Sequence, residues 1–127
     1  MNFEKVIFGF FIVLSLTLNA GFVLGEYNNP ADHGVYEFFA VIVVNFIAMG
    51  LKLGDRSQIG AILLATSLVA NFELIAAAFH WTFAVHVAET GLTPDVMSSI
   101  ISLATGALIA NVISVVILVS ETLMSRL

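Results

Sequence analysis

The sequence is poor in charge and contains no cysteine, and both deficits narrow what the chain can be. Without cysteine, its 127 residues can form neither a disulfide framework nor a thiolate metal site. Only 10% of the residues are charged, whereas soluble domains carry about 25%. Four residues are basic and the formal net charge is −5, which argues against nucleic acid as a partner.

Apolar residues take the place of the missing charges. They make up 60% of the chain, and the mean hydropathy is +1.06. A soluble fold of this size could not bury so much apolar surface, so lipid must be the solvent for most of the chain. We therefore predict one membrane domain, residues 1–127, embedded in a lipid bilayer.

Four apolar runs are long enough to cross a bilayer core, which needs about 20 residues per helix. The predicted helices cover residues 3–25, 35–53, 59–87 and 95–124. Before the last of them, Thr93 is a natural N-cap and Pro94 fits the first helical position. The predicted fold class is all-α: four transmembrane helices in an antiparallel up-down bundle.

The basic residues predict the orientation of this bundle. All of them lie at a terminus or in the second loop: Lys5, Lys52, Arg56 and Arg126. The first and third loops hold acidic residues instead: Glu26, Asp32, Glu37, Glu89 and Asp95. Lysine and arginine in short loops favour the cytoplasmic side of a membrane, so both termini are predicted to be cytoplasmic.

Each predicted helix contains one asparagine: Asn19, Asn45, Asn71 and Asn111. Polar side chains inside a bilayer are costly and are functional candidates for that reason. Two interpretations stay open. The asparagines can join helices through hydrogen bonds, or their hard oxygen ligands can form a shared site for Na⁺, K⁺ or a proton-linked water chain.

Glu73 is an acidic residue near the middle of the third predicted helix. An ionised carboxylate in hydrocarbon must be paired, hydrated or protonated. Glu73 shares a stripe with Thr66 and His80, spaced by seven residues, and His80 is a candidate relay near the outer boundary. Asn71 lies about 200° away around the helix, so this helix is predicted to be central in the bundle or to face a second protomer.

The outer loops offer a second candidate site. His33 and Glu37 are four residues apart at one helix start, and His86 and Glu89 are three apart at one helix end. Histidine and carboxylate ligands of this kind bind Zn²⁺ or another divalent ion. The competing interpretation is that all four are solvated loop residues.

Small residues at spacings of four form a ridge on the fourth helix: Ser102, Gly106, Ala110 and Ser114. Such ridges let helices approach closely, within one chain or between copies. We therefore predict a homo-oligomer or a membrane-protein partner. No nucleophile–base pair or cofactor motif is visible, so neither an enzyme nor a cofactor is expected.

Three stretches carry a resemblance to a known family: Asn2–Phe11, Leu51–Ala61 and Ser120–Met124. They resemble a family of small bacterial inner-membrane proteins of unknown function. The resemblance implies a four-helix protein of the bacterial inner membrane and offers no catalytic residues. Independently of the resemblance, the interior Glu73, the asparagines and the acidic outer loops predict a transport-class protein, either a cation or proton pathway or an accessory subunit of a transporter. The alternative is a structural subunit of a larger membrane complex.

Overall fold

The computed structural model describes residues 3–25 and 28–125, with only the backbone described at Asp32 and Ser125. Within these residues four long helices form the fold: α1 (Phe3–Val23), α2 (Val35–Lys52), α3 (Gln58–Thr82) and α4 (Pro94–Ser125). A 3-10 turn, η1 (Pro30–Asp32), precedes α2, and a π-helical turn, η2 (Phe83–Val87), continues α3. The predicted all-α fold of four helices is confirmed, and each helix is long and apolar enough to cross a membrane.

Side-chain caps start the second pair of helices. As predicted, α4 begins at Pro94, and the Oγ1 of Thr93 accepts a hydrogen bond from the Val96 amide at 3.2 Å. Ser57 does the same for α3, where its Oγ accepts from the Gly60 amide at 2.9 Å. Both caps satisfy an amide that has no partner within its own helix.

Two helix ends differ from the prediction by more than one residue. α1 ends at Val23 instead of residue 25, because Gly25 adopts a φ of 103°, which does not fit a right-handed helix. The last residues of the third predicted helix form the π-helical turn η2 instead of regular α-helix. Such turns usually occur singly within α-helices, and here the turn prolongs the apolar span to Gln58–Val87.

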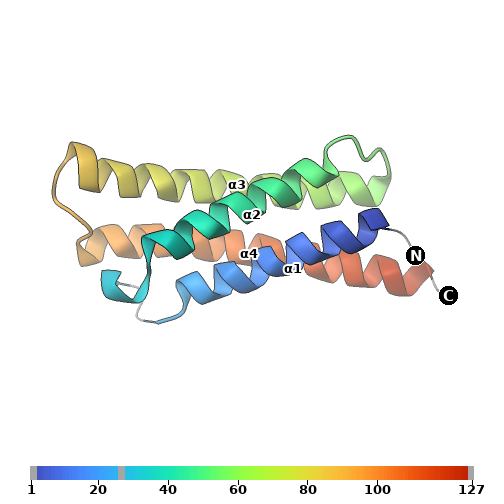
Figure 1. Cartoon of the computed structure of the whole chain (residues 1–127), viewed down its shortest axis with the longest axis horizontal. Coiled ribbons are helices and arrows are strands. Elements are labelled where there is room, and N and C mark those ends of the chain that lie inside the picture. Colours follow the sequence, from blue (N-terminus) through green and yellow to red (C-terminus); the bar gives the residue numbers. More distant parts are fainter. Residues whose placement is uncertain (1–2, 26–27, 126–127) are drawn as a thin grey trace.

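Consecutive helices lie side by side and reverse direction, so the two chain ends lie at the same end of the molecule (Figure 1). We call this the termini end, and the opposite end, with the loops around η1 and after η2, the loop end. α1 packs against α2 and α4, and α3 packs against the same two helices. The Phe22 and Phe38 rings stack 5.0 Å apart between α1 and α2 near the loop end.

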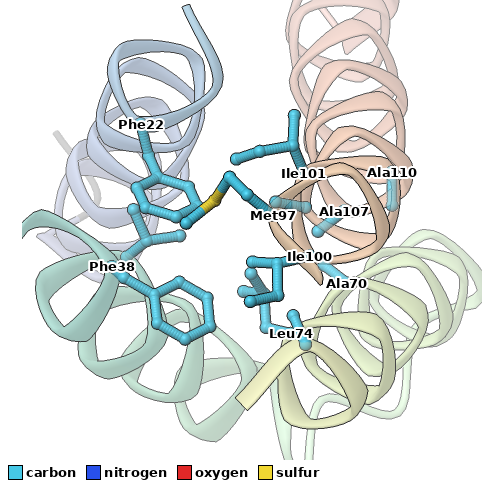
Figure 2. Packing of buried hydrophobic residues seen from close by; sticks show 12 residues of the cluster. Phe22, Phe38, Ala70, Leu74, Met97, Ile100, Ile101, Ala107 and Ala110 are labelled. Atoms are coloured by element: carbon cyan, nitrogen blue, oxygen red, sulfur yellow. The ribbon is translucent and has the colours of Figure 1, made fainter. Parts of the chain in front are cut away.

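Two apolar clusters fill the interior. The larger lies towards the loop end and draws on all four helices, with Phe22, Phe38, Leu74 and Met97 among its side chains (Figure 2). The smaller lies towards the termini end and consists of Phe8, Ile12, Ala48 and Leu63. The buried polar residues of each helix lie where its contribution to one cluster gives way to its contribution to the other, with Asn71 directly after Ala70 of the larger cluster, so they meet at mid-height of the bundle.

Candidate functional site

A layer of buried polar side chains crosses the bundle between the two apolar clusters. Its members come from all four helices, and none is more than 3% exposed. They are Ser15, Asn19, Asn45, Ser67, Asn71, Asn111 and Ser114. This polar layer contains the four asparagines that the sequence placed within the apolar runs, together with three serines.

Asn71 ties α3 to α2 through the backbone. Its Nδ2 donates to the carbonyl oxygen of Asn45 at 3.2 Å and to that of Ser67 at 2.8 Å. Asn45 in turn donates from its Nδ2 to the carbonyl oxygen of Val41 at 2.8 Å. Because two carbonyls hold the nitrogen of Asn71, the direction of its Oδ1 is fixed as well.

Asn19 joins α1 to the backbone of α4. The hydrogen-bond network assigns the orientation of its carboxamide. The nitrogen donates to the Ala104 carbonyl at 3.0 Å, and the oxygen accepts from the Leu108 amide at 3.1 Å and from Asn111 Nδ2 at 3.3 Å. Hydrogen bonds between membrane helices are worth about 0.6–2 kcal/mol each, so Asn19 and Asn71 act as connectors between helices.

Three buried oxygens of the polar layer find no hydrogen-bond partner among the described residues: Ser67 Oγ, Asn71 Oδ1 and Asn111 Oδ1. Other hydroxyls at this height are satisfied. Ser15 Oγ donates to the Phe11 carbonyl at 2.7 Å. A buried polar atom without a partner costs about 1–3 kcal/mol, so these three atoms mark the least satisfied part of the layer.

Glu73 lies outside the polar layer. Its carboxylate sits directly over Gly106 of α4, so close that a Cβ on that glycine would collide with it. The side chain is half-buried and makes no hydrogen bond or ion pair among the described residues. Asn71 turns towards α2 while Glu73 turns towards α4, so within one chain Glu73 does not join the layer that gathers the four asparagines. We call the contact of Glu73 with Gly106, beside exposed Ser102, the α3–α4 seam.

The polar stripe predicted on α3 leaves the bundle interior as it approaches the loop end. The hydroxyl of Thr66 pairs with Ser114 inside the bundle, Glu73 is half-buried, and His80 is exposed. A seven-residue repeat drifts by about 20° per repeat on a straight helix, which accounts for this gradual turn. Of the two positions predicted for the third helix, the central one is wrong, because α3 packs mainly on α4 and α2 at one corner of the bundle; the other, a face turned to a second protomer, stays a prediction.

The four residues predicted as a second candidate site in the outer loops do not gather into a metal centre. His33 is 2% exposed, and its Nδ1 lies within hydrogen-bond distance of the Phe22 carbonyl at the end of α1. Glu37, His86 and Glu89 are exposed. Across residues 3–25 and 28–125, no group of three histidine, cysteine or acidic side chains could hold a metal ion. Glu26 and the side chain of Asp32 lie outside the described part.

Charged residues at the termini end pair with one another. Lys5 Nζ lies 3.1 Å from Glu121 Oε1, a contact that no sequence spacing indicates. Lys52 Nζ lies 3.3 Å from Asp55 Oδ2. Hydrogen bonds from the amide and hydroxyl of Ser57, helped by Lys52, hold the pKa of Asp55 below its ordinary value of 3.8. Arg126, the fourth basic residue, lies outside the described residues.

Of the comparisons with known proteins, only the one with family models gives a match. Neither a curated protein nor a solved structure matches the chain. A family model matches residues 32–122, from the turn before α2 almost to the end of α4. Of the three stretches that carried the resemblance, Leu51–Ala61 lies wholly within the match. Since the matched region spans well over half of the chain, the protein belongs to the DUF6394 family, a family of unknown function.

Proposed function

We propose that the chain crosses a bacterial inner membrane four times, up and down, with both termini cytoplasmic, and that it works in proton or cation transport as an oligomer. The orientation is supported by Lys5, Lys52 and Arg56, which all lie at the termini end. Basic residues near helix ends favour the cytoplasmic side. The transport role is supported by one carboxylate that lies near the middle of an apolar helix.

That carboxylate belongs to Glu73, near the midpoint of the apolar span Gln58–Val87. In hydrocarbon an ionised carboxylate is costly unless something neutralises it. Glu73 meets no cation and no hydrogen-bond donor among the described residues. Protonation or a group beyond the described residues must therefore neutralise it, and a carboxyl group that gains and loses a proton in mid-membrane is the basis of a proton relay.

The interior of a single bundle offers a poor route. The two apolar clusters lie on either side of the polar layer, and both contain fully buried side chains. The α3–α4 seam is different, because there the carboxylate is half-buried and borders the outer surface of the bundle. The proposed route therefore runs along this seam, between copies of the chain. The asparagines hold the helices in place and do not line the route.

Proton flux into liposomes tests the proposal. Wild-type protein is reconstituted, a membrane potential is imposed with K⁺ and valinomycin, and an internal pH dye follows proton entry. Glu73→Gln keeps the size and shape of the side chain but cannot ionise. We expect wild type to conduct at least tenfold above empty liposomes and Glu73→Gln to fall to that background.

Glu37→Gln is the matched control, because Glu37 is an exposed glutamate in the first turn of α2. It should conduct like wild type. Background flux in wild type, or equal flux in wild type and Glu73→Gln, contradicts the transport role. Repeating the measurement without valinomycin, with an imposed Na⁺ or K⁺ gradient and a dye for that ion, separates a proton relay from a cation pathway.

A second candidate function is a structural subunit of a larger membrane complex. The engagement of Asn19 and Asn71 in bonds between helices favours it. Of the small-residue ridge, Ser102 is exposed and Gly106 partly so. Affinity purification of wild type and Ser102→Leu from native membranes tests it: a stable partner lost with Ser102→Leu, but kept with Glu73→Gln, supports this role over transport.

A further inference from the structure

We propose that the polar layer binds one water molecule in the interior of the bundle, held by Ser67 and Asn71 of α3 and Asn111 of α4. These residues carry the three buried oxygens that have no partner among the described residues. Their side chains are 1%, 3% and 0% exposed, so bulk solvent does not reach them. The site is separate from the α3–α4 seam and does not depend on the proposed transport role.

The register of the two helices brings the three residues to one height. Thr66 of α3 meets Ser114 of α4 through their hydroxyls. Asn111 precedes Ser114 by three residues, or about 4.5 Å of helix rise towards the loop end. Because α3 runs the opposite way, the same rise from Thr66 leads to a height midway between Ser67 and Asn71.

The polar atoms at this height have fixed roles. The nitrogen of Asn71 donates to the carbonyls of Asn45 and Ser67, and the nitrogen of Asn111 donates to Asn19. Both carboxamide oxygens are therefore left as acceptors. The hydroxyl of Ser67 is free to donate, because the bond from Asn71 uses the carbonyl of Ser67 and not its Oγ.

Water matches this set of atoms. Its two hydrogens meet the two carboxamide oxygens, and its own oxygen accepts the hydroxyl proton of Ser67. The result is three hydrogen bonds, which is the typical number for a buried water. A cation fits less well, because the layer contains no acidic side chain and Glu73 is turned to the seam. A bare charge among a few neutral oxygens in a low-dielectric interior is costly.

Ser67→Ala tests the site through the direction of its effect. If water is bound, the substitution removes one of its three bonds, and we expect the midpoint of thermal unfolding in detergent micelles to fall by about 2–4 °C. If the hydroxyl has no partner, removing it is neutral or raises the midpoint. Ser15→Ala is the matched control, since this equally buried hydroxyl bonds to the Phe11 carbonyl within its own helix. A midpoint for Ser67→Ala at or above that of Ser15→Ala overturns the proposal.

Nuclear magnetic resonance gives a second, direct readout. In ¹⁵N-labelled protein we expect magnetisation to pass from water to the carboxamide protons of Asn71 and Asn111. The transfer should weaken at least twofold in Ser67→Ala. Absence of transfer in the wild type overturns the site. A saturable shift of the same resonances on adding NaCl or KCl, matched against choline chloride, also overturns it and identifies an ion in place of water.

Discussion

Asn71 and Glu73 lie two residues apart at mid-height of α3 and have opposite surroundings. Asn71 is 3% exposed and its nitrogen is held by two backbone carbonyls. Glu73 is half-buried, rests on Gly106 and finds no donor among the described residues. The same helix therefore places a hydrogen-bonded carboxamide in the interior and a carboxylate without a hydrogen-bond donor among the described residues at the edge of the bundle.

The difference follows from the hydrogen-bonding capacity of the two groups. A carboxamide both donates and accepts, so it can bond to helix backbones, which offer carbonyls in every turn. An ionised carboxylate only accepts, and the amides of a helix interior are already engaged. A glutamate in the polar layer would be an unpaired buried charge, whereas at the α3–α4 seam it can exchange a proton or meet a second chain.

The largest loss of stability is expected from removing an asparagine whose hydrogen bonds join two helices in the polar layer. Asn19→Leu removes the side-chain donor to the Ala104 carbonyl and the acceptor for Asn111 Nδ2. We expect the free energy of unfolding to fall by about 2–4 kcal/mol, measured by denaturant titration in mixed micelles. Thr17→Leu on the exposed face of α1 is the control and should change it by less than about 0.5 kcal/mol. Equal losses in the two variants would contradict the conclusion that the hydrogen bonds of Asn19 to α4 stabilise the bundle.

A smaller effect is expected at the seam. Gly106→Ala places a Cβ where the Glu73 carboxylate lies, so that side chain must move. We expect a loss of about 1 kcal/mol in the wild-type background, limited by the flexibility of glutamate. In a Glu73→Ala background the same change should be neutral or stabilising by about 0.5–1 kcal/mol, because alanine favours helix over glycine. Additive effects of the two substitutions, measured as a double-mutant cycle, would show that the side chains are not in contact.

The smallest effect concerns Asp55, outside both regions at the termini end. Its pKa lies below 3.8 in the folded protein because Ser57 and Lys52 hydrogen-bond to the carboxylate. The stabilisation from this shift is complete above the ordinary pKa and is lost as the pH falls through the lower, folded value. Unfolding midpoints measured from pH 6 to pH 2 should therefore fall less steeply below about pH 4 in Asp55→Asn than in wild type. Identical pH profiles would contradict the link between these bonds and stability.

Individual residues show how far the sequence could predict the site. Thr93 and Pro94 marked the start of α4, because capping depends only on neighbouring residues. The opposite faces of Asn71 and Glu73 also followed from helix geometry alone. Which of the two faces lies inside did not, since apolar residues surround α3 on nearly every side. The pairing of Lys5 with Glu121 was equally hidden, because these residues come from opposite ends of the chain.

The sequence by itself determined four apolar helices and, to within one residue, where each one begins, because an apolar run of this length satisfies its backbone hydrogen bonds within one helix. The tertiary structure decided which polar side chains meet. It gathered Asn19, Asn71 and Asn111 into a layer tied to helix backbones and left Glu73 over Gly106 at the edge. That choice depends on how the helices rotate and pack against one another, which the apolar runs, being similar on all faces, do not specify.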